Sequence, residues 1–339
     1  MNVREQDCKS NGAVGVDRPI FIVGCPRSGT SLLRDLLHAH PNLAFPTESH
    51  FIPVFFKAYG DPRSARDAQK LAAKILALRW VRSWKLPLTP ADFAPDKTFR
   101  ELVIRLYRAY ARKEQKPRWG DKTPQYAAEL PLLHALFPNC KIIHLYRDGR
   151  DVALSYLEVG LDPGNVFTAA RAWKHYVTHG RRDGAALPAG IYREVRYETL
   201  LARPEETLQE ICAFIDEPFD AVVFESNLLR HNQRQRRFGH RDFGIPDTAV
   251  VPYNVQKWKT GMSRRQRLLF ESVAGDLLAS LGYETTGATR PISIPERLMW
   301  GTHHALWWFY DRLNSKDLLE WSATFSSMTI ARIHYLFAA

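Results

Sequence analysis

Residues 24–31, GCPRSGTS, combine a glycine-rich turn with hydroxyl side chains, which is the chemistry of an anion site. An apolar run at residues 20–23 precedes this turn, and a leucine-rich stretch follows it. A turn between a strand and a helix points backbone N–H groups and the positive end of the helix dipole at one place. Further donors are the hydroxyls of Ser28, Thr30 and Ser31. This segment, here called the anion loop, is therefore predicted to hold a tetrahedral anion.

The anion loop follows the nucleotide-binding pattern G-x-x-x-x-G-K-[ST] except at the lysine, where it has Thr30. In enzymes that use nucleoside triphosphates, that lysine reaches the β- and γ-phosphates while a hydroxyl and an acidic residue hold Mg²⁺. Arg27 places a planar guanidinium in the turn instead, which suits a tetrahedral oxyanion and stays charged at any ordinary pH. A P-loop nucleotide kinase stays open as an alternative, although its lysine is missing.

A second junction of the same kind carries Arg147 and Ser155. The strand-like run KIIHLY at residues 141–146 leads into RDGR and then into a helical pattern that contains Ser155. Neighbouring parallel strands bring such junctions side by side, so Arg147 and Ser155 could hold a second anion near the first. The alternative is a surface ion pair of Arg147 with Asp148 or Asp151, and a serine that only faces solvent.

Strands and helices alternate along the chain. Strand-like runs at residues 20–23, 141–146 and 191–197 each precede a helical pattern, and the helix after the third run is predicted at about Pro204 to Ile215. This alternation predicts an α/β fold, a three-layer sandwich in which helices cover both faces of a central parallel sheet and ligands bind at the carboxyl ends of the strands. Thr123 and Pro124 also have the residue types of a helix start, and that helix is predicted to end at Phe137.

The domain organisation follows from the same patterns. We predict a flexible leader at residues 1–17, one main domain at 18–286, and an aromatic-rich helical extension at 287–339. Within the main domain, helical periodicity between Pro62 and Pro117 predicts an insertion at about 62–116. For the extension we favour a helix docked on the domain; the wall of a substrate pocket and an interfacial membrane helix are the alternatives.

Composition sets broad limits on function. The formal net charge is +11, which suits nucleic acid, a membrane surface or a small polyanion. A non-catalytic nucleic-acid-binding module therefore stays as a second alternative, although no nucleic-acid motif is visible. The four cysteines form no closely spaced pair, and no acidic pair adjoins the anion loop, so we expect no metal site. Without an apolar signal or a long apolar run, a cytoplasmic protein with no membrane span is expected.

The segments GCPRSGTSLLRDLLHAHPNLAFPTESHFIP and LYRDGRDVALSYL resemble the two donor-binding signatures of sulfotransferases that use 3′-phosphoadenosine 5′-phosphosulfate (PAPS). The similarity runs from about Arg18 to Tyr283 and is greatest to the tyrosylprotein sulfotransferases and their bacterial relatives. It implies a P-loop NTPase-like sulfotransferase fold and in-line transfer of a sulfonate group from PAPS to an acceptor hydroxyl, without a metal. The hydroxyl could belong to peptide tyrosine, a carbohydrate, a lipid or a small phenol. Transfer leaves 3′,5′-ADP.

The resemblance also implies donor-binding roles. The residues of the anion loop would bind the 5′-phosphosulfate: Arg27, Ser28, Gly29, Thr30 and Ser31. Arg147 and Ser155 would bind the 3′-phosphate, Tyr197 would contact the adenine, and Lys257 lies in a segment that would close over the nucleotide. Arg150 and Arg196 are possible additions, and the basic run at residues 230–241 is either an anion-attracting lid or a solvated face.

Catalytic roles come from the resemblance as well. Glu48 matches the general base of the tyrosylprotein enzymes, and His50 is its rival because cytosolic sulfotransferases use a histidine for that step. On a strand, these two side chains would face the same side. Lys122 matches a lysine that helps to stabilise the leaving group, and Arg27 would stabilise charge on the transferred group.

Overall fold

The computed structural model describes residues 17–159, 163–221, 224, 255–288 and 290–303. Its centre is a five-stranded sheet with the order β2-β3-β1-β4-β5, and every pair of neighbouring strands is parallel. The strands are β1 (Ile20–Gly24), β2 (Leu43–Ala44), β3 (Arg118–Lys122), β4 (Lys141–Tyr146) and β5 (Tyr192–Arg196). The predicted α/β fold with a central parallel sheet is confirmed.

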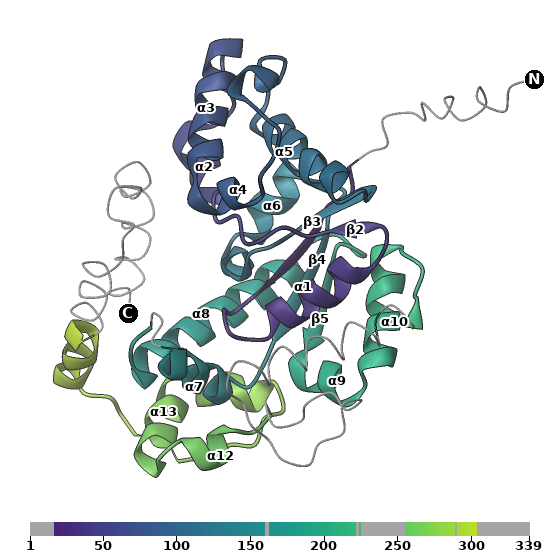
Figure 1. The fold of residues 1–339 in the computed structure, drawn as a ribbon. Coiled ribbons are helices and arrows are strands. Elements are labelled where there is room, and N and C mark those ends of the chain that lie inside the picture. The colour runs from purple at the N-terminus through teal and green to yellow at the C-terminus, as the bar shows by residue number, and fades with distance from the viewer. Residues whose placement is uncertain (1–16, 160–162, 222–223, 225–254, 289, 304–339) are drawn as a thin grey trace, which may run out of the picture.

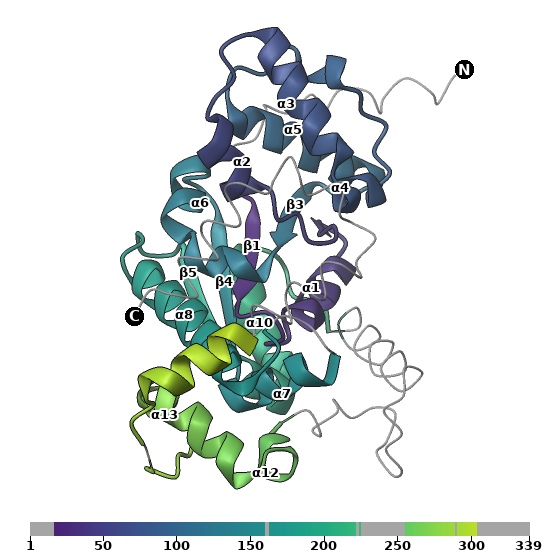
Figure 2. The same cartoon turned by 90° about the vertical axis from the view of Figure 1, so that its left-hand side faces the viewer.

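Helices cover both faces of this sheet, which gives the three predicted layers (Figures 1 and 2). The helices around the sheet are α1 (Thr30–Ala39), α6 (Leu130–Leu136), α7 (Gly149–Val159), α8 (Val166–Ala185), α9 (Tyr197–Ala202), α10 (Pro204–Ile215), α12 (Trp258–Gly261) and α13 (Arg264–Ser280). Between β2 and β3 the chain forms α2 (Ile52–Tyr59), α3 (Ala65–Ala77), α4 (Arg79–Ser83), the 3₁₀ helix η1 (Pro90–Phe93) and α5 (Phe99–Lys113). Figure 1 shows this second group at one end of the molecule, beyond the β2–β3 edge.

The alternating side chains of β1 bind the layers together. Ile20 and Ile22 belong to the apolar cluster formed with α1 and α10, whereas Phe21 and Val23 belong to the cluster on the opposite face. All four are fully buried, as expected for a central parallel strand. Burying both faces fixes the register of β1, so the position at which it ends and the anion loop begins is also fixed.

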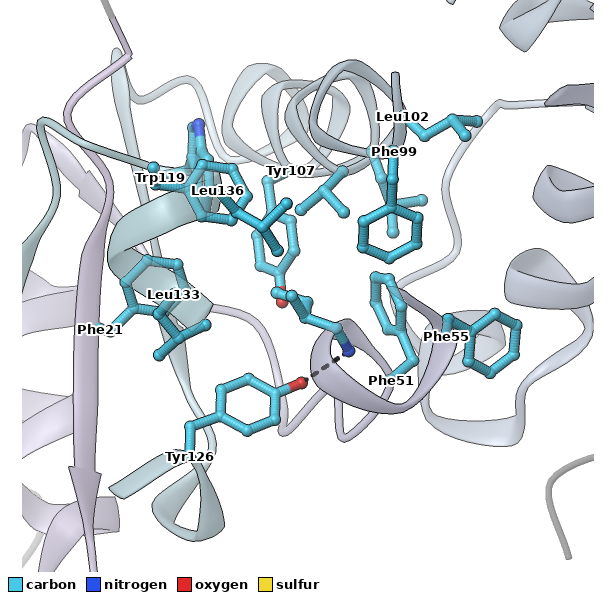
Figure 3. Close-up of a cluster of buried hydrophobic side chains, with 14 of the residues drawn as sticks. Phe21, Phe51, Phe55, Phe99, Leu102, Tyr107, Trp119, Tyr126, Leu133 and Leu136 are labelled. Carbon is cyan, nitrogen blue, oxygen red and sulfur yellow. Dashed lines mark hydrogen bonds between the residues drawn. The ribbon is translucent and has the colours of Figure 1, made fainter. Parts of the chain in front are cut away.

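The second of these clusters joins the helices between β2 and β3 to the sheet. Figure 3 shows Phe51, Phe55 and Phe99 close to one another, with Tyr107 between them and Trp119. The Tyr107 and Trp119 rings stack at 4.6 Å between centroids. This contact fixes α5 against β3, and with it the position of the strand end that carries Lys122.

Some predicted elements need correction. The observed β4 has the predicted bounds, and α10 begins and ends where predicted. The predicted helix from Thr123 to Phe137 is wrong as one element, because the chain forms the 3₁₀ helix η2 (Pro124–Ala128) and then α6. Thr123 is the N-cap residue of η2, with Pro124 after it as predicted, but its side chain makes no capping hydrogen bond. The strand β3, with the sequence RWGDK, was not predicted, since it shows neither an apolar run nor a regular alternation.

Parts of the predicted organisation lie outside the described residues: most of the leader, the basic run at 230–241 and residues 304–339 of the extension. The domain boundaries stay predictions. The described part of the chain contains no helix that is both long and apolar enough to cross a membrane.

Candidate active site

The anion loop connects the end of β1 to the start of α1. Gly29 is the N-cap of α1 and has φ +94°, in the left-handed region that favours glycine. A Cβ at Gly29 would lie 2.3 Å from a ring carbon of Tyr197, so both the backbone and the space require glycine. No described side chain caps α1. The first N–H groups of the helix, which have no partner within it, are therefore left for a ligand.

The hydroxyl groups of Ser28, in the anion loop, and Ser155, in the second signature, lie where an anion could bind. Ser28 is fully buried, and its Oγ has no hydrogen-bond partner among the described residues. A buried hydroxyl without a partner costs free energy, and an oxyanion in the loop would supply the partner. Arg27 is exposed and its Nε donates to Ser155 Oγ on α7 at 3.1 Å. The two sequence signatures are therefore in direct contact.

Arg147 lies where β4 ends, next to β1. Its side chain is 7% exposed, its Nη1 donates to the Arg27 carbonyl at 3.4 Å, and its guanidinium lies 4.8 Å from the centre of the Tyr197 ring. Its Nη2 lies 3.6 Å from Asp151, so an ion pair with Asp151 does exist, but it is buried and not at the surface as in the alternative given above. It is long, however, and Arg147 also faces the anion loop, so the ion pair and an anion-binding role are compatible.

From the sequence, Asp151 was considered only as an ion-pair partner of Arg147, yet it joins two parts of the site. Its carboxylate accepts from the backbone N–H groups of Gln256 and Trp258, at 2.8 and 2.9 Å. Burial raises the pKa of Asp151 to about 6, although the Arg147 charge and these hydrogen bonds oppose the shift. The two bonds hold the segment around Lys257 against α7, and Lys257 itself lies 3.9 Å from Glu158.

Lys122 joins the anion loop to Glu48. Lys122 is the last residue of β3, and its side chain is 5% exposed. Its Nζ donates to Ser31 Oγ at 3.1 Å and also to Glu48 Oε1. On the other side, His50 Nε2 lies 2.9 Å from Glu48 Oε2. A carboxylate and an anion-binding turn therefore share a single ammonium group.

These contacts set the charge state of Glu48. Burial alone would raise the pKa of this carboxyl, but the hydrogen bond from His50 and the charge of Lys122 outweigh it and lower the pKa to about 2. Glu48 is thus ionised throughout the physiological range. It has the protonation state of a general base, but its proton affinity is held down by its two partners.

Glu48 and His50 meet in a way that the sequence did not indicate. They lie in the loop between β2 and α2, not on a strand, and His50 has φ +55°. The left-handed backbone at His50 turns its ring back onto Glu48 and against Trp80 of α4, with 5.3 Å between the ring centres. The two side chains therefore lie together as expected, but a turn of the backbone brings them together and not a strand.

Two further arginines differ in their environment. Arg150 is fully buried: it forms two hydrogen bonds with Asp148 and one with Glu271, and it lies over the Trp258 ring at 3.5 Å. These contacts occupy it within the core, so the structure argues against the suggested donor contact. Arg196 is paired with Glu198 and lies 4.1 Å from the centre of the Tyr283 ring.

The described residues hold no cluster of three or more His, Cys, Asp or Glu side chains placed to bind a metal ion. The positive charge that the described residues bring to this site comes from Arg27, Lys122 and Arg147 and from the N-terminus of α1.

Comparison with known proteins connects this geometry to a family. The family model described as "Sulfotransferase family" matches residues 19–221. The nodulation protein NoeE of Sinorhizobium fredii is 27% identical over 78% of this chain, and this chain spans 65% of its length. Protein-tyrosine sulfotransferase 1 of Homo sapiens is 27% identical over 82% of this chain, with 74% of its own length covered.

The fold is also similar to a solved structure. The sulfotransferase domain from the curacin biosynthetic pathway superposes with a TM-score of 0.55 at 24% identity, covering 79% of this chain and 99% of that domain. At this identity the likeness concerns the fold alone.

Proposed function

The chain belongs to the sulfotransferase family, and on that premise we propose that it transfers the sulfonate group of PAPS to an acceptor hydroxyl at the ends of β1, β3 and β4. The single observation that carries the proposal is the position of Lys122, whose Nζ bonds to both Ser31 of the anion loop and Glu48. Sulfonate transfer needs an anion site and a proton acceptor on either side of the reacting sulfur. Here the anion loop and Glu48, the candidate proton acceptor, both contact the Lys122 side chain.

The donor has anionic groups at both ends of its nucleoside, so it needs two anion sites. The anion loop, with the unpartnered Ser28 Oγ, suits the phosphosulfate end. Arg147 and Ser155 suit the 3′-phosphate, since Arg27 and Arg147 already contact each other across the two junctions. Arg147 brings a planar, permanently charged fork that matches phosphate. Tyr197 lies against Gly29 and the Arg147 guanidinium, and this position beside both anion sites supports a contact with the nucleotide.

The transfer forms a bond between the acceptor oxygen and sulfur, and it breaks the bond between sulfur and the 5′-phosphate oxygen. Glu48 accepts the proton of the acceptor hydroxyl. Lys122 and Arg27 stabilise the negative charge that develops on the leaving phosphate and on the equatorial sulfonate oxygens. His50 supports Glu48 through the 2.9 Å contact, and it is the rival base. The side chains thus provide positioning and charge stabilisation, which are the main terms in such displacements.

For the acceptor, we propose a tyrosine hydroxyl in a peptide as the first candidate. The support is the similarity to protein-tyrosine sulfotransferases of animals. Carbohydrates, lipids and small phenols present a hydroxyl of the same kind, and they are tested alongside.

Radiolabelled PAPS offered with tyrosine peptides, oligosaccharides, lipids and phenols tests the proposal. We expect label transfer to at least one class. In parallel, 3′,5′-ADP without Mg²⁺ should raise the melting temperature, whereas ATP with Mg²⁺ should not. The reverse pattern of stabilisation would favour the nucleotide kinase and contradict the proposal. Stabilisation by 3′,5′-ADP without transfer to any acceptor would leave only donor binding supported.

A further inference from the structure

We infer that Ser49 and Tyr126 are positioning residues for the transfer: they hold the segment with Glu48 and His50 in register with Lys122. The inference rests on the proposed function, because it concerns the geometry of the same site. Tyr126 belongs to neither sequence signature, and Ser49 lies in the first one without any role of its own assigned to it. Within the described residues, both hydroxyls bond to groups other than the Glu48 carboxylate and Lys122 Nζ.

Ser49 lies between the two candidate bases, Glu48 and His50, and is held in place by hydrogen bonds. It is fully buried although Glu48 and His50 on either side of it are partly exposed. Its N–H donates to Thr123 Oγ1 at 3.1 Å, and its Oγ lies 2.9 Å from the hydroxyl of Tyr126. Thr123 directly follows Lys122, so these bonds tie the residue next to the base to the residue next to the lysine.

Tyr126 fixes the same segment a second time. Its hydroxyl also accepts from the backbone N–H of Ile52 at 3.0 Å, the first residue of α2. Figure 3 shows this bond reaching from the Tyr126 hydroxyl to the start of the helix that follows Phe51 and carries Phe55. A single buried hydroxyl thus bonds at both ends of residues 49–52. Because His50 between them has φ +55°, the turn is held in a backbone conformation that non-glycine residues rarely adopt.

The strand end is anchored from the other side by Tyr107. Its hydroxyl donates to Asp121, a fully buried carboxylate next to Lys122. Lys122 therefore follows a residue fixed by α5 and precedes a residue fixed by Ser49. Such support matters because a displacement of about 1 Å at the reacting groups can cost on the order of a hundredfold in rate.

The test uses Tyr126→Phe and Ser49→Ala, with Tyr192→Phe as the matched control. Tyr192 also uses its hydroxyl in two hydrogen bonds, to His144 and Glu194, but on β5. We expect kcat to fall by about 10- to 100-fold in both test variants, while the dissociation constant of 3′,5′-ADP changes by less than about threefold. The control should keep the wild-type kcat.

A double-mutant cycle with Glu48→Gln separates positioning from a loss of stability. If Tyr126 acts through Glu48, its substitution should have little further effect in the Glu48→Gln background. An equal fall of kcat in both backgrounds would overturn the inference, as would a Tyr126→Phe variant no slower than the control. Should Tyr126→Phe fail to fold by circular dichroism, Ser49→Ala decides by the same measurements. A wild-type protein that transfers no sulfonate would contradict the proposed function itself, which this cycle presupposes.

Discussion

Replacing Glu48 by glutamine is the most direct test of the chemistry. Glutamine keeps the size of the side chain and an oxygen acceptor for one of the two partners, Lys122 or His50. It cannot take a proton from the acceptor hydroxyl. The change therefore removes general-base catalysis and leaves the shape of the site in place.

Two effects of opposite direction are expected. Loss of a general base lowers kcat by about 10²- to 10⁴-fold, which corresponds to roughly 3–5 kcal/mol in the activation free energy. Donor affinity should rise instead, because the carboxylate no longer competes for Lys122. Glu48 is 32% exposed, so solvent screens this pair, and we expect about two- to tenfold tighter binding of 3′,5′-ADP.

Single-turnover and steady-state rates with radiolabelled PAPS give the first quantity, and isothermal titration calorimetry with 3′,5′-ADP gives the second. His50→Ala is measured beside it, and we expect a smaller fall in kcat because His50 only supports Glu48. Near-normal turnover in Glu48→Gln together with an inactive His50→Ala would refute the reasoning and make His50 the base. Weakened 3′,5′-ADP binding in Glu48→Gln would refute the competition for Lys122.

Three further outcomes are expected. Arg147→Ala should weaken 3′,5′-ADP binding by about 10- to 100-fold in calorimetry, because charge-assisted hydrogen bonds are lost. The control is Arg193→Ala, which should bind as wild type because Arg193 pairs with Glu210 away from the anion loop. Gly29→Ala should lower the free energy of unfolding by about 2 kcal/mol in urea titrations, because it combines φ +94° with a clash against the Tyr197 ring; an unchanged midpoint would contradict this. The Glu48 pKa lies at about 2, below its ordinary 4.5, so its contacts stabilise the folded protein fully above pH 4.5 and lose this effect as the pH falls toward 2. The difference in the free energy of unfolding between wild type and Glu48→Gln should therefore shrink from pH 4.5 to pH 2, and a constant difference would contradict this prediction.

The sequence predicted the parts of the fold that local patterns determine. The strand KIIHLY contains the closely spaced apolar residues Ile142, Ile143 and Leu145, and the helix at Pro204–Ile215 begins at a proline, so both could be placed accurately. The strand RWGDK could not, since only pairing with β1 and β2 makes it a strand. Thr123 looks like a helix cap in sequence, but its hydroxyl bonds to Ser49, a contact between residues far apart in the chain.

The candidate site follows the same division. The two anion-binding junctions could be predicted because each lies within one short segment, and parallel pairing of β1 with β4 brings them together. The bond from Lys122 to Ser31 and Glu48 joins three segments, and no spacing in the sequence encodes it. Asp151 looked only like an ion-pair partner of Arg147, because the N–H groups it binds lie more than a hundred residues away.

The structure also explains how an anion loop with Thr30 in place of lysine can still have an ammonium group beside it. Thr30 is buried under the loop, and its methyl carbon lies in the space next to Gly24, so a longer charged side chain there would have to leave that position. The ammonium comes from Lys122 on the neighbouring strand and reaches Ser31, the next residue of the loop, at 3.1 Å. Because Lys122 extends from β3, its ammonium group also contacts Glu48, which a lysine at position 30 of the loop would not be positioned to do. In the proposed mechanism the anion and the base are therefore coupled through one charge. We expect a donor anion that draws Lys122 toward the loop to weaken the contact of Lys122 with Glu48, which would make the carboxylate a stronger base.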